Sequence, residues 1–427
     1  MTISPLDRPN RSIPSRVFGS ITPGGVRQSV FTLISTAMGG GLLCLPFVMR
    51  ECGWLLGSLL LCTSALIGYF SMTMLIHSAH KVRKYSYSSL LAHCLGSWTG
   101  PLLDMIIVMY GVGALVAYLI FLGDFIPRIA KLIVHTDCSR SLAILLSAFS
   151  VSPMVFPAKL SALKYASPIS TICLIFTASV TLIEARAMHR TASDGEFRAV
   201  IWSRNILRSF AITLFAYVCH LNVVPVAGEM VEQTSARTQK IVARVNSILL
   251  AFYAIIGVCG YYSFGGFVSQ NFVADYPQDS LLVLLCRCML TLSLLICLPI
   301  NATPVAHAFI HFLHVSGIVN HRNTGIQSPL LPEASEEEPY KNLRISIAIG
   351  SLFVAALIAI EVPGAANVLG VLGGSFGTIL MIICPLVIYN HVFRDQITTA
   401  TRIVMFFLIL AAFISFIAVG VMLGSII

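Results

Sequence analysis

Apolar residues stand in long runs along this chain, separated by short polar segments. Each run is close to the roughly 20 residues that an α-helix needs to cross a bilayer. The runs do not alternate between polar and apolar positions, and an open sheet would leave backbone groups without hydrogen bonds in lipid, which excludes strands. We therefore predict an all-α polytopic membrane protein with eleven transmembrane helices, at residues 27–49, 54–77, 101–126, 141–157, 166–184, 206–228, 243–265, 281–305, 343–361, 365–391 and 402–425.

The segments around these runs define the organisation of the chain. Residues 1–26 are polar and carry several prolines and arginines, which indicates a cytosolic N-terminal tail rather than a signal peptide. Helices one to eight occupy residues 27–310, and helices nine to eleven occupy residues 343–427. Residues 311–342 form an acidic loop that cannot bury enough surface to fold alone. We expect this loop to be a cytosolic linker, or else a regulatory or partner-docking segment.

Composition supports a membrane protein and argues against a nucleic-acid partner. Only 11% of the residues are charged and 57% are apolar, whereas a soluble domain carries about a quarter charged residues. The net charge of +9 is consistent with topology, because most Lys and Arg fall on one side when the N-terminus is placed in the cytosol. The lipid bilayer is therefore the expected partner, and the protein is expected to be multi-pass.

The first apolar run contains an unusual glycine triplet, Gly39 to Gly41. Each glycine destabilises a helix by roughly 1 kcal/mol relative to alanine, and broken backbone at membrane depth is tolerated where it lines a cavity. A broken helix exposes amides at a positive dipole end, which can hold a carboxylate. Alternatively, the glycines only allow two helices to pack closely.

The sixth run is also interrupted, by His220, Asn222 and Pro225, and then ends at Glu229. It lies five runs after the first. Two interrupted helices in corresponding positions indicate an inverted-repeat transporter with its binding site between them. The repeat would comprise helices one to five and six to ten, with the eleventh outside it.

Several motifs in this order resemble the amino acid/auxin permease family of amino acid transporters. They are Arg27-x-Ser29 followed by Gly39 to Phe47, then Tyr110-Gly111, Tyr118-Leu119 and Gly123-Asp124 on the third run, and Phe215 to Met230 on the sixth. The resemblance implies a LeuT-like fold with a 5+5 inverted repeat plus one extra helix. It also implies secondary active transport of an amino acid substrate by alternating access, coupled to a proton or sodium.

The same resemblance implies a binding site between the two breaks. Backbone amides at the glycine triplet would receive the substrate carboxylate, carbonyls from Phe215 to His220 would hold the ammonium group, and Tyr118 would close one side. The expected substrate-binding residues are Ser35, Gly39, Gly40, Gly41, Tyr118, Phe215, Tyr217, Cys219, His220 and Asn222.

The coupling ion is less defined by sequence. Sodium-coupled members of the family carry an asparagine near the position of Ser35, and serine is a poorer ligand, so the departure favours protons. His220 could bind and release a proton, since an unperturbed histidine titrates near pH 6.5; equally, it could be a hydrogen-bonded group that holds the break. Ser35, Thr291 and Ser293 are the remaining ion-coupling candidates.

Other titratable groups have simpler interpretations. Asp104 and Asp124 lie near the ends of the third run, where charges are usually solvated. His307, His311 and His314 follow a helical spacing at the end of the eighth run, as either a metal patch or a solvated helix end. Overlapping GxxxG spacings at Gly370/Gly374 and Gly373/Gly377 predict close helix packing rather than a phosphate loop.

The sequence contains none of the motifs sought for an enzyme or a cofactor. A P-loop, HExxH and GxSxG are absent, the cysteines lack zinc spacing, and no acid lies within a turn of His220. We predict no catalytic residue, metal or cofactor. A membrane amino acid sensor is the alternative function. The lack of a midplane carboxylate favours neutral substrates, and the membrane is either the plasma membrane or that of an acidic organelle.

Overall fold

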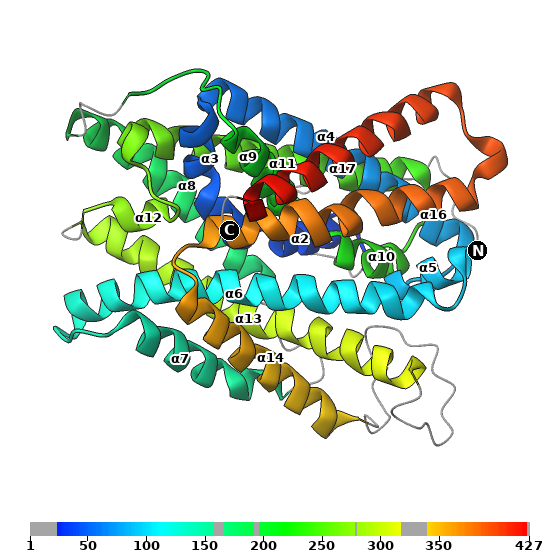
Figure 1. Ribbon diagram of the computed structural model, residues 1–427, viewed down its shortest axis with the longest axis horizontal. Coiled ribbons are helices and arrows are strands. Elements are labelled where there is room, and N and C mark those ends of the chain that lie inside the picture. Colours follow the sequence, from blue (N-terminus) through cyan, green and yellow to red (C-terminus); the bar gives the residue numbers. More distant parts are fainter. Residues whose placement is uncertain (1–23, 157–165, 192–195, 278–279, 317–339, 425–427) are drawn as a thin grey trace, which may run out of the picture.

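The computed structural model describes residues 24–156, 166–191, 196–277, 280–316 and 340–424. Within these residues the regular secondary structure is entirely helical. Figure 1 shows the long helices lying beside one another, mostly along the long axis of the molecule. The expectation of an all-α fold is confirmed. Residues 1–23 and 317–339, which hold most of the predicted tail and acidic loop, lie outside the described residues.

Nine helical spans among the described residues are long and apolar enough to cross a membrane, and a bent pair makes a tenth. The unbroken ones are α4 (Trp54–Val82), α6 (Thr99–Ile133), α8 (Ala166–Thr191), α11 (Ser235–Phe264), α13 (Leu281–Val315), α14 (Lys341–Glu361) and α17 (Thr399–Gly424). The interrupted ones are α2 (Val26–Ala37) with η1 (Gly40–Cys44) and α3 (Leu45–Cys52), α9 (Asn205–Ala216) with α10 (His220–Glu229), and α15 (Ala365–Leu372) with α16 (Cys384–Val392).

The predicted span at 141–157 is shorter than the others. It forms α7 (Arg140–Val151) and a 3₁₀ turn, η2 (Ser152–Val155). Pro153 stands at the start of that turn, where its ring and missing N–H disfavour a continued α-helix. A membrane-crossing length is therefore met by nine or ten helices of the described chain, and the count of eleven stays a prediction.

Two short helices, α5 (Tyr87–Leu95) and α12 (Phe272–Asp275), were not predicted. Neither is long enough to register as an apolar run. They lie at opposite ends of the bundle, α12 on the left and α5 on the right of Figure 1. We call these ends the α12 end and the α5 end.

Glycines in the tenth span allow close helix packing, as the GxxxG spacing predicts. A methyl group at Gly373 would lie 2.0 Å from the carbonyl oxygen of Ala211 on α9, and one at Gly374 would lie 2.5 Å from Val419 on α17. This part of the span is π-helical, in η5 (Gly373–Gly377) and η6 (Ile379–Ile383). Such widened turns occur mostly as short interruptions of α-helices.

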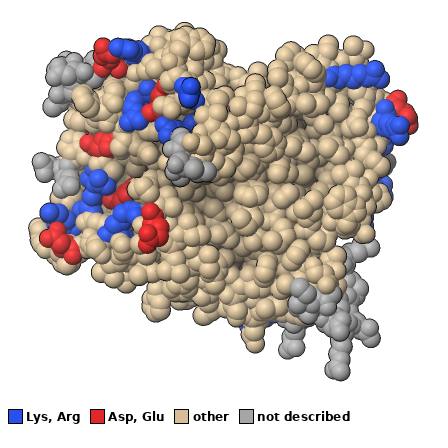
Figure 2. All heavy atoms as spheres, in the orientation of Figure 1, with Lys and Arg blue, Asp and Glu red and all other residues tan. Residues whose placement is uncertain are grey.

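The surface carries the charge distribution of a membrane protein. On the face shown in Figure 2, Lys, Arg, Asp and Glu gather at the two ends, and the belt between them is uncharged. Large apolar side chains are exposed where lipid is expected; Phe406 and Phe413 on α17 are each 63% exposed. In water such an exposed apolar surface would be unfavourable, so this surface is suited to contact with lipid.

Candidate substrate-binding site

The first span is broken at the glycine triplet. Helix α2 ends at Ala37, Met38 leaves the helical region with ψ 74°, and the chain resumes as η1 at Gly40. The two halves are bent by 53°. The helix is therefore discontinuous here, as the sequence predicts.

The sixth span is broken in the corresponding place. Helix α9 ends at Ala216 and α10 begins at His220, with Tyr217 to Cys219 between them outside the helix. The carbonyls at the end of a helix have no partner within it. The two breaks therefore present backbone acceptors from α2 and α9, and backbone donors from η1 and α10.

One side chain joins the two breaks. The hydroxyl of Tyr253, on α11, lies 3.1 Å from the carbonyl oxygen of Ala37 and 2.9 Å from that of Ala216. Its ring packs edge-on against Tyr217, with the centroids 5.3 Å apart. Tyr253 is fully buried, so a single donor holds the last turns of α2 and α9 beside each other. Sequence reasoning missed it because it stands within an ordinary apolar run.

A small cavity lies between these breaks and the helices α6 and α13. Its volume is about 30 Å³, which is enough room for water. The lining residues are Thr36, Ala37, Gly39, Tyr110, Ala114, Tyr118, Phe215, Val218, Cys219, Leu221, Asn222 and Asn301.

Half of the expected substrate-binding residues line this cavity. They are Gly39, Tyr118, Phe215, Cys219 and Asn222. Ser35, Gly40, Gly41, Tyr217 and His220 are not among the lining residues. Gly40 instead packs under Phe121, which a methyl group there would approach to 2.6 Å, and Gly41 packs against Ala216. The triplet thus serves both as the break and as a close contact between helices.

Gly39 is the glycine that faces the cavity. A methyl group on it would lie 2.3 Å from the hydroxyl oxygen of Tyr118. That is far inside van der Waals contact, and Tyr118 is itself only 5% exposed. The absence of a side chain at Gly39 therefore lets the Tyr118 hydroxyl reach the broken backbone.

Three polar lining residues, Thr36, Tyr110 and Asn301, were not predicted as site residues. Asn301 on α13 donates a hydrogen bond to the carbonyl oxygen of Cys297 at 2.9 Å. The ring centroids of Tyr110 and Phe215 are 5.7 Å apart. An isolated amide within the eighth apolar run was a signal that could have found Asn301, because polar groups at membrane depth usually line a cavity or pack inside the bundle.

His220 is buried and is not among the cavity-lining residues, although its neighbours Cys219 and Leu221 are. It is 0% exposed, and its Nε2 lies 2.8 Å from the hydroxyl of Ser71 on α4. Its Nδ1 has no hydrogen-bond partner. These contacts fix the start of α10 on α4.

The other ion-coupling candidates also lie outside the cavity lining. The hydroxyl of Ser35 donates to the carbonyl oxygen of Thr32 at 2.9 Å. Ser293 is 8% exposed, and the Thr291 hydroxyl oxygen is buried without a hydrogen-bond partner. Within the described residues, no group of three or more His, Cys, Asp or Glu could hold a metal ion.

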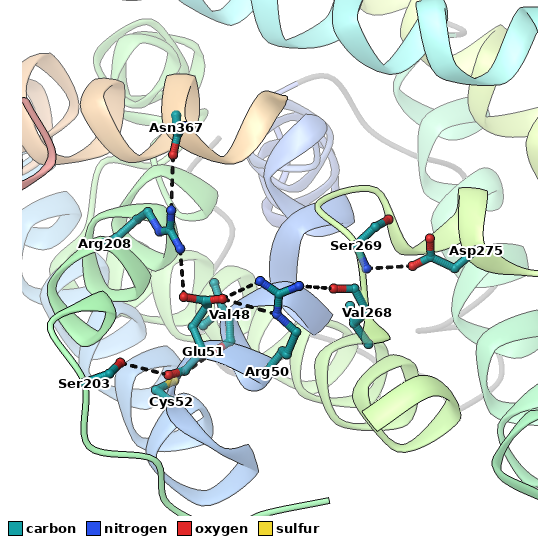
Figure 3. A network of polar contacts seen from close by, with 10 residues as sticks. All are labelled: Val48, Arg50, Glu51, Cys52, Ser203, Arg208, Val268, Ser269, Asp275 and Asn367. Carbon is teal, nitrogen blue, oxygen red and sulfur yellow. Dashed lines mark hydrogen bonds and ion pairs between the residues drawn. The ribbon is translucent and has the colours of Figure 1, made fainter. Parts of the chain in front are cut away.

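A polar network closes the α12 end of the bundle (Figure 3). Glu51, at the end of α3, lies 2.5 Å from Arg50 Nη2 and 2.7 Å from Arg208 Nη2 on α9. Arg208 also donates to Asn367 Oδ1 on α15 at 3.3 Å, and Arg50 donates to the carbonyl oxygen of Val268 at 2.7 Å. We call Arg50, Glu51 and Arg208 the arginine clamp. It joins α3, the second half of the first span, to α9, the first half of the sixth span. It also connects these two half-helices to α15 and to the loop before α12.

The loop before α12 makes further contacts with the bundle. The Cys44 thiol lies 3.1 Å from the carbonyl oxygen of Gln270, and Gln270 Oε1 accepts from the amide of Ala366 at 3.0 Å. Asn271 donates to Asp124 on α6 at 3.1 Å. Burial raises the pKa of Asp275, although the Ser269 amide donates to it and offsets part of the shift. The α12 end is thus closed by contacts from several helices to one loop.

Comparison with known proteins supports these features. A family model described as "Transmembrane amino acid transporter protein" matches residues 22–427. A Toxoplasma gondii protein named as an amino acid transporter (AAT1) is 29% identical; the match covers 70% of this chain and 42% of that protein's length. Sodium-coupled neutral amino acid transporter 7 of Xenopus laevis is 24% identical, over 84% of this chain and 78% of that protein. Vacuolar amino acid transporter 5 of Saccharomyces cerevisiae is 26% identical, over 85% and 88%.

Solved structures with little sequence identity share the fold. A Na⁺-coupled sialic acid symporter is 11% identical and has a TM-score of 0.59, covering 97% of this chain and 91% of that chain. A manganese transporter of Eremococcus coleocola is 12% identical and has a TM-score of 0.60, covering 93% and 87%. These are transporters of the LeuT-like fold, and the predicted fold class is confirmed. By the match over residues 22–427, the chain belongs to the transmembrane amino acid transporter family.

Proposed function

We propose that this protein moves neutral amino acids across a membrane by alternating access, as a secondary active transporter. The observation that carries the proposal is the cavity between the two helix breaks, lined by Gly39, Val218 and Cys219 from the breaks themselves. Backbone donors and acceptors converge there, as in the discontinuous helices of transporters that bind their substrates near the midplane.

The two breaks suit the two charged ends of an amino acid. The amides at the start of η1, around Gly40, stand at the positive end of a helix and attract a carboxylate. The carbonyls that end α2 and α9 attract an ammonium group, and Tyr253 already bonds two of them. Tyr118 would cover the substrate from α6.

The lining favours a neutral substrate side chain. None of the lining residues is charged, and a buried charge without a partner is strongly disfavoured. Thr36, Asn222 and Asn301 offer hydroxyl and amide groups for a polar or small side chain. A matched relative is named as a neutral amino acid transporter, which agrees with this choice.

Proton coupling is part of the proposal, with His220 and the hydroxyls of Ser35, Thr291 and Ser293 as the ion-coupling candidates within the bundle. The contact between His220 and Ser71, and the absence of His220 from the cavity lining, favour a structural role for this histidine. We propose an internal organelle membrane, which agrees with the vacuolar relatives. We also propose that the N-terminus lies in the cytosol, on the distribution of Lys and Arg in the sequence.

The test is exchange of labelled alanine in proteoliposomes that contain the purified protein. We expect saturable exchange that other neutral amino acids inhibit and that lysine and glutamate do not. Gly39→Val should abolish exchange, because the added carbons would displace Tyr118 from the site. The matched control is Gly350→Ala on α14, where an added methyl group meets nothing within 4 Å. Binding of alanine without exchange in the wild type would contradict transport.

A further inference from the structure

A second buried carboxylate lies at the α5 end of the bundle. Asp104, near the start of α6, is 3% exposed. Its Oδ2 lies 2.5 Å from Nδ1 of His311 on α13, and its Oδ1 accepts a hydrogen bond from the hydroxyl of Ser88 on α5. The sequence placed Asp104 at a solvated helix end and His311 in a row of three histidines. The fold instead combines them in one cluster across three helices.

We propose that Asp104 and His311 form a proton-binding site that couples proton movement to amino acid transport. The inference rests on the proposed transport function and names its coupling site. It assigns the proton to a carboxylate–imidazole pair at the α5 end, away from the substrate cavity and from His220.

The pair has the chemistry to gain and lose a proton. An unperturbed imidazole titrates near pH 6.5, and a buried carboxylate is stabilised by a positively charged partner. Nδ1 of His311 faces Asp104, so in the neutral imidazole Nδ1–H donates to the carboxylate. The proton then binds at Nε2, forming an imidazolium–carboxylate pair, and leaves from the same atom.

Water can reach this atom from the α5 end. The side chain of His311 is 44% exposed, although that of Asp104 is only 4% exposed. Helices α6 and α13 each have 35 residues, a length of about 50 Å against a hydrocarbon core of about 30 Å. Their terminal turns therefore extend beyond the core, and a proton can enter from solution.

Within the described part of the chain, Asp104 accepts a hydrogen bond from Ser88 and pairs with His311. On α13, His307 and His314 lie about a turn to either side of His311, and each takes part in an interaction. On α14, the buried Arg344 donates to the carbonyl oxygens of Val155 and Phe156, and Lys341 is exposed. Helix α6 carries no further charged residue before Asp124.

The titratable groups of α5 also point elsewhere. Tyr87 donates to the carbonyl oxygen of Leu380 in η6 at 2.6 Å, His93 is exposed and Cys94 is buried. Burial raises the pKa of the Cys94 thiol, so this side chain remains uncharged. The cluster at this end thus consists of Asp104, His311 and the Ser88 hydroxyl.

The pair is mechanically connected to the substrate site. Helices α6 and α13 pack side by side (Figure 1) and carry the cavity residues Tyr118 and Asn301. Helix α5 contacts α10, the second half of the broken sixth span, and α16. Protonation of His311 withdraws charge from Asp104 and weakens it as an acceptor for Ser88. The packing of α5 against α6, and with it the position of α10, therefore changes when the pair binds a proton.

The experiment compares two assays in proteoliposomes, exchange of labelled alanine without a gradient and accumulation driven by an inward proton gradient. A gradient of one pH unit sustains about tenfold accumulation when one proton accompanies each amino acid. We expect wild type, His307→Gln and His314→Gln to accumulate alanine. Asp104→Asn and His311→Gln should exchange alanine but only equilibrate it, and the pH profile of their uptake should be flat.

The outcomes separate this inference from the proposed function. Gradient-driven accumulation by Asp104→Asn or His311→Gln would overturn the proton site, as would loss of exchange together with accumulation in both variants, because that result indicates a structural role. Absence of exchange in the wild type would instead overturn the transport function. Proton entry recorded with an internal pH dye gives a second readout, and it should disappear in both variants.

Discussion

Glu51 and Asp104 are the two acidic side chains in the buried part of the described chain, and they lie at opposite ends of the bundle. Glu51 is held by two arginines, whereas Asp104 is held by a histidine and a serine. An arginine stays charged at any physiological pH, so its contact is fixed. A histidine partner makes the contact depend on pH. The partner of a buried carboxylate thus determines whether it acts as a clamp or as a proton site.

The two regions also connect different parts of the fold. The arginine clamp joins α3 to α9, the halves of the broken spans (Figure 3). The Asp104 pair joins the unbroken helices α6 and α13, and reaches the broken sixth span only through α5. We infer that the clamp makes α3 and α9 move together. The Asp104–His311 pair changes when it binds a proton, and it acts on the broken sixth span only through α5.

The largest expected effect comes from removing the carboxylate of the clamp. Glu51→Ala leaves Arg50 and Arg208 side by side without a counter-charge, and breaking a buried pair costs about 3 kcal/mol or more. We expect a lower midpoint of thermal unfolding in detergent. Glu196→Ala, which removes the partner of Arg198 from an exposed ion pair, should change stability by less than about 1 kcal/mol. Equal effects of the two variants would remove the distinction between a buried clamp and a surface pair.

The next prediction contrasts the two ends in one assay. Glu51→Gln loses the charge and keeps an acceptor oxygen for only one of the two arginines, because its amide nitrogen donates, so the maximal rate of alanine uptake should fall. Its dependence on pH should stay that of the wild type, because arginine side chains in proteins keep their charge at physiological pH. A flattened pH profile in Glu51→Gln would show that the clamp, rather than the Asp104 pair, responds to the proton.

An intermediate effect is expected between the two ends, at the breaks. Tyr253→Phe removes the hydroxyl shared by the carbonyls of Ala37 and Ala216, and a hydrogen bond of this kind contributes about 1 kcal/mol. The apparent affinity for alanine in exchange should fall about fivefold. Tyr69→Phe on α4 is the control, because Tyr69 lies outside the cavity lining. Unchanged affinity in Tyr253→Phe would separate this bridge from the substrate site.

The smallest effect is expected at the periphery of the clamp. Asn367→Ala removes the 3.3 Å hydrogen bond from Arg208 to α15 but leaves the ion pair with Glu51. Initial uptake rates should change by no more than about twofold, since a partly exposed hydrogen bond contributes little. If Asn367→Ala impaired uptake as strongly as Glu51→Ala, the contact to α15 would be the more important part of the network.

The spans were predictable because a helix that crosses lipid needs about 20 consecutive, mostly apolar residues, which can be counted along the sequence. Each apolar run had to become a helix of bilayer length. The predicted limits lie within ten residues of the described ones, and the largest differences are at the start of α11 and the end of α13. The run at 141–157 is the exception in length, since Pro153 ends the α-helix early. The breaks were predictable from Gly39 to Gly41 and from the polar residues near His220, because these residue types weaken a helix locally.

The partners of the buried polar groups were not predictable from spacing. Asp104 and His311 are separated by 207 residues, and Ser71 and His220 by 149. Whether a charge near a helix end is solvated or buried depends on which helix packs over it, and α5 had no signal of its own. Tyr253 and Asn301 stand within ordinary apolar runs, so their positions at the site depend on which helices pack together and could not be predicted from sequence spacing.

The most direct test is simultaneous recording of labelled alanine and protons entering wild-type proteoliposomes under an inward proton gradient. We expect saturable entry of both, with alanine accumulating about tenfold for a gradient of one pH unit. We also expect proton entry to depend on alanine. Alanine uptake no greater than in protein-free liposomes would contradict the transport function, and alanine entry without proton entry would contradict proton coupling.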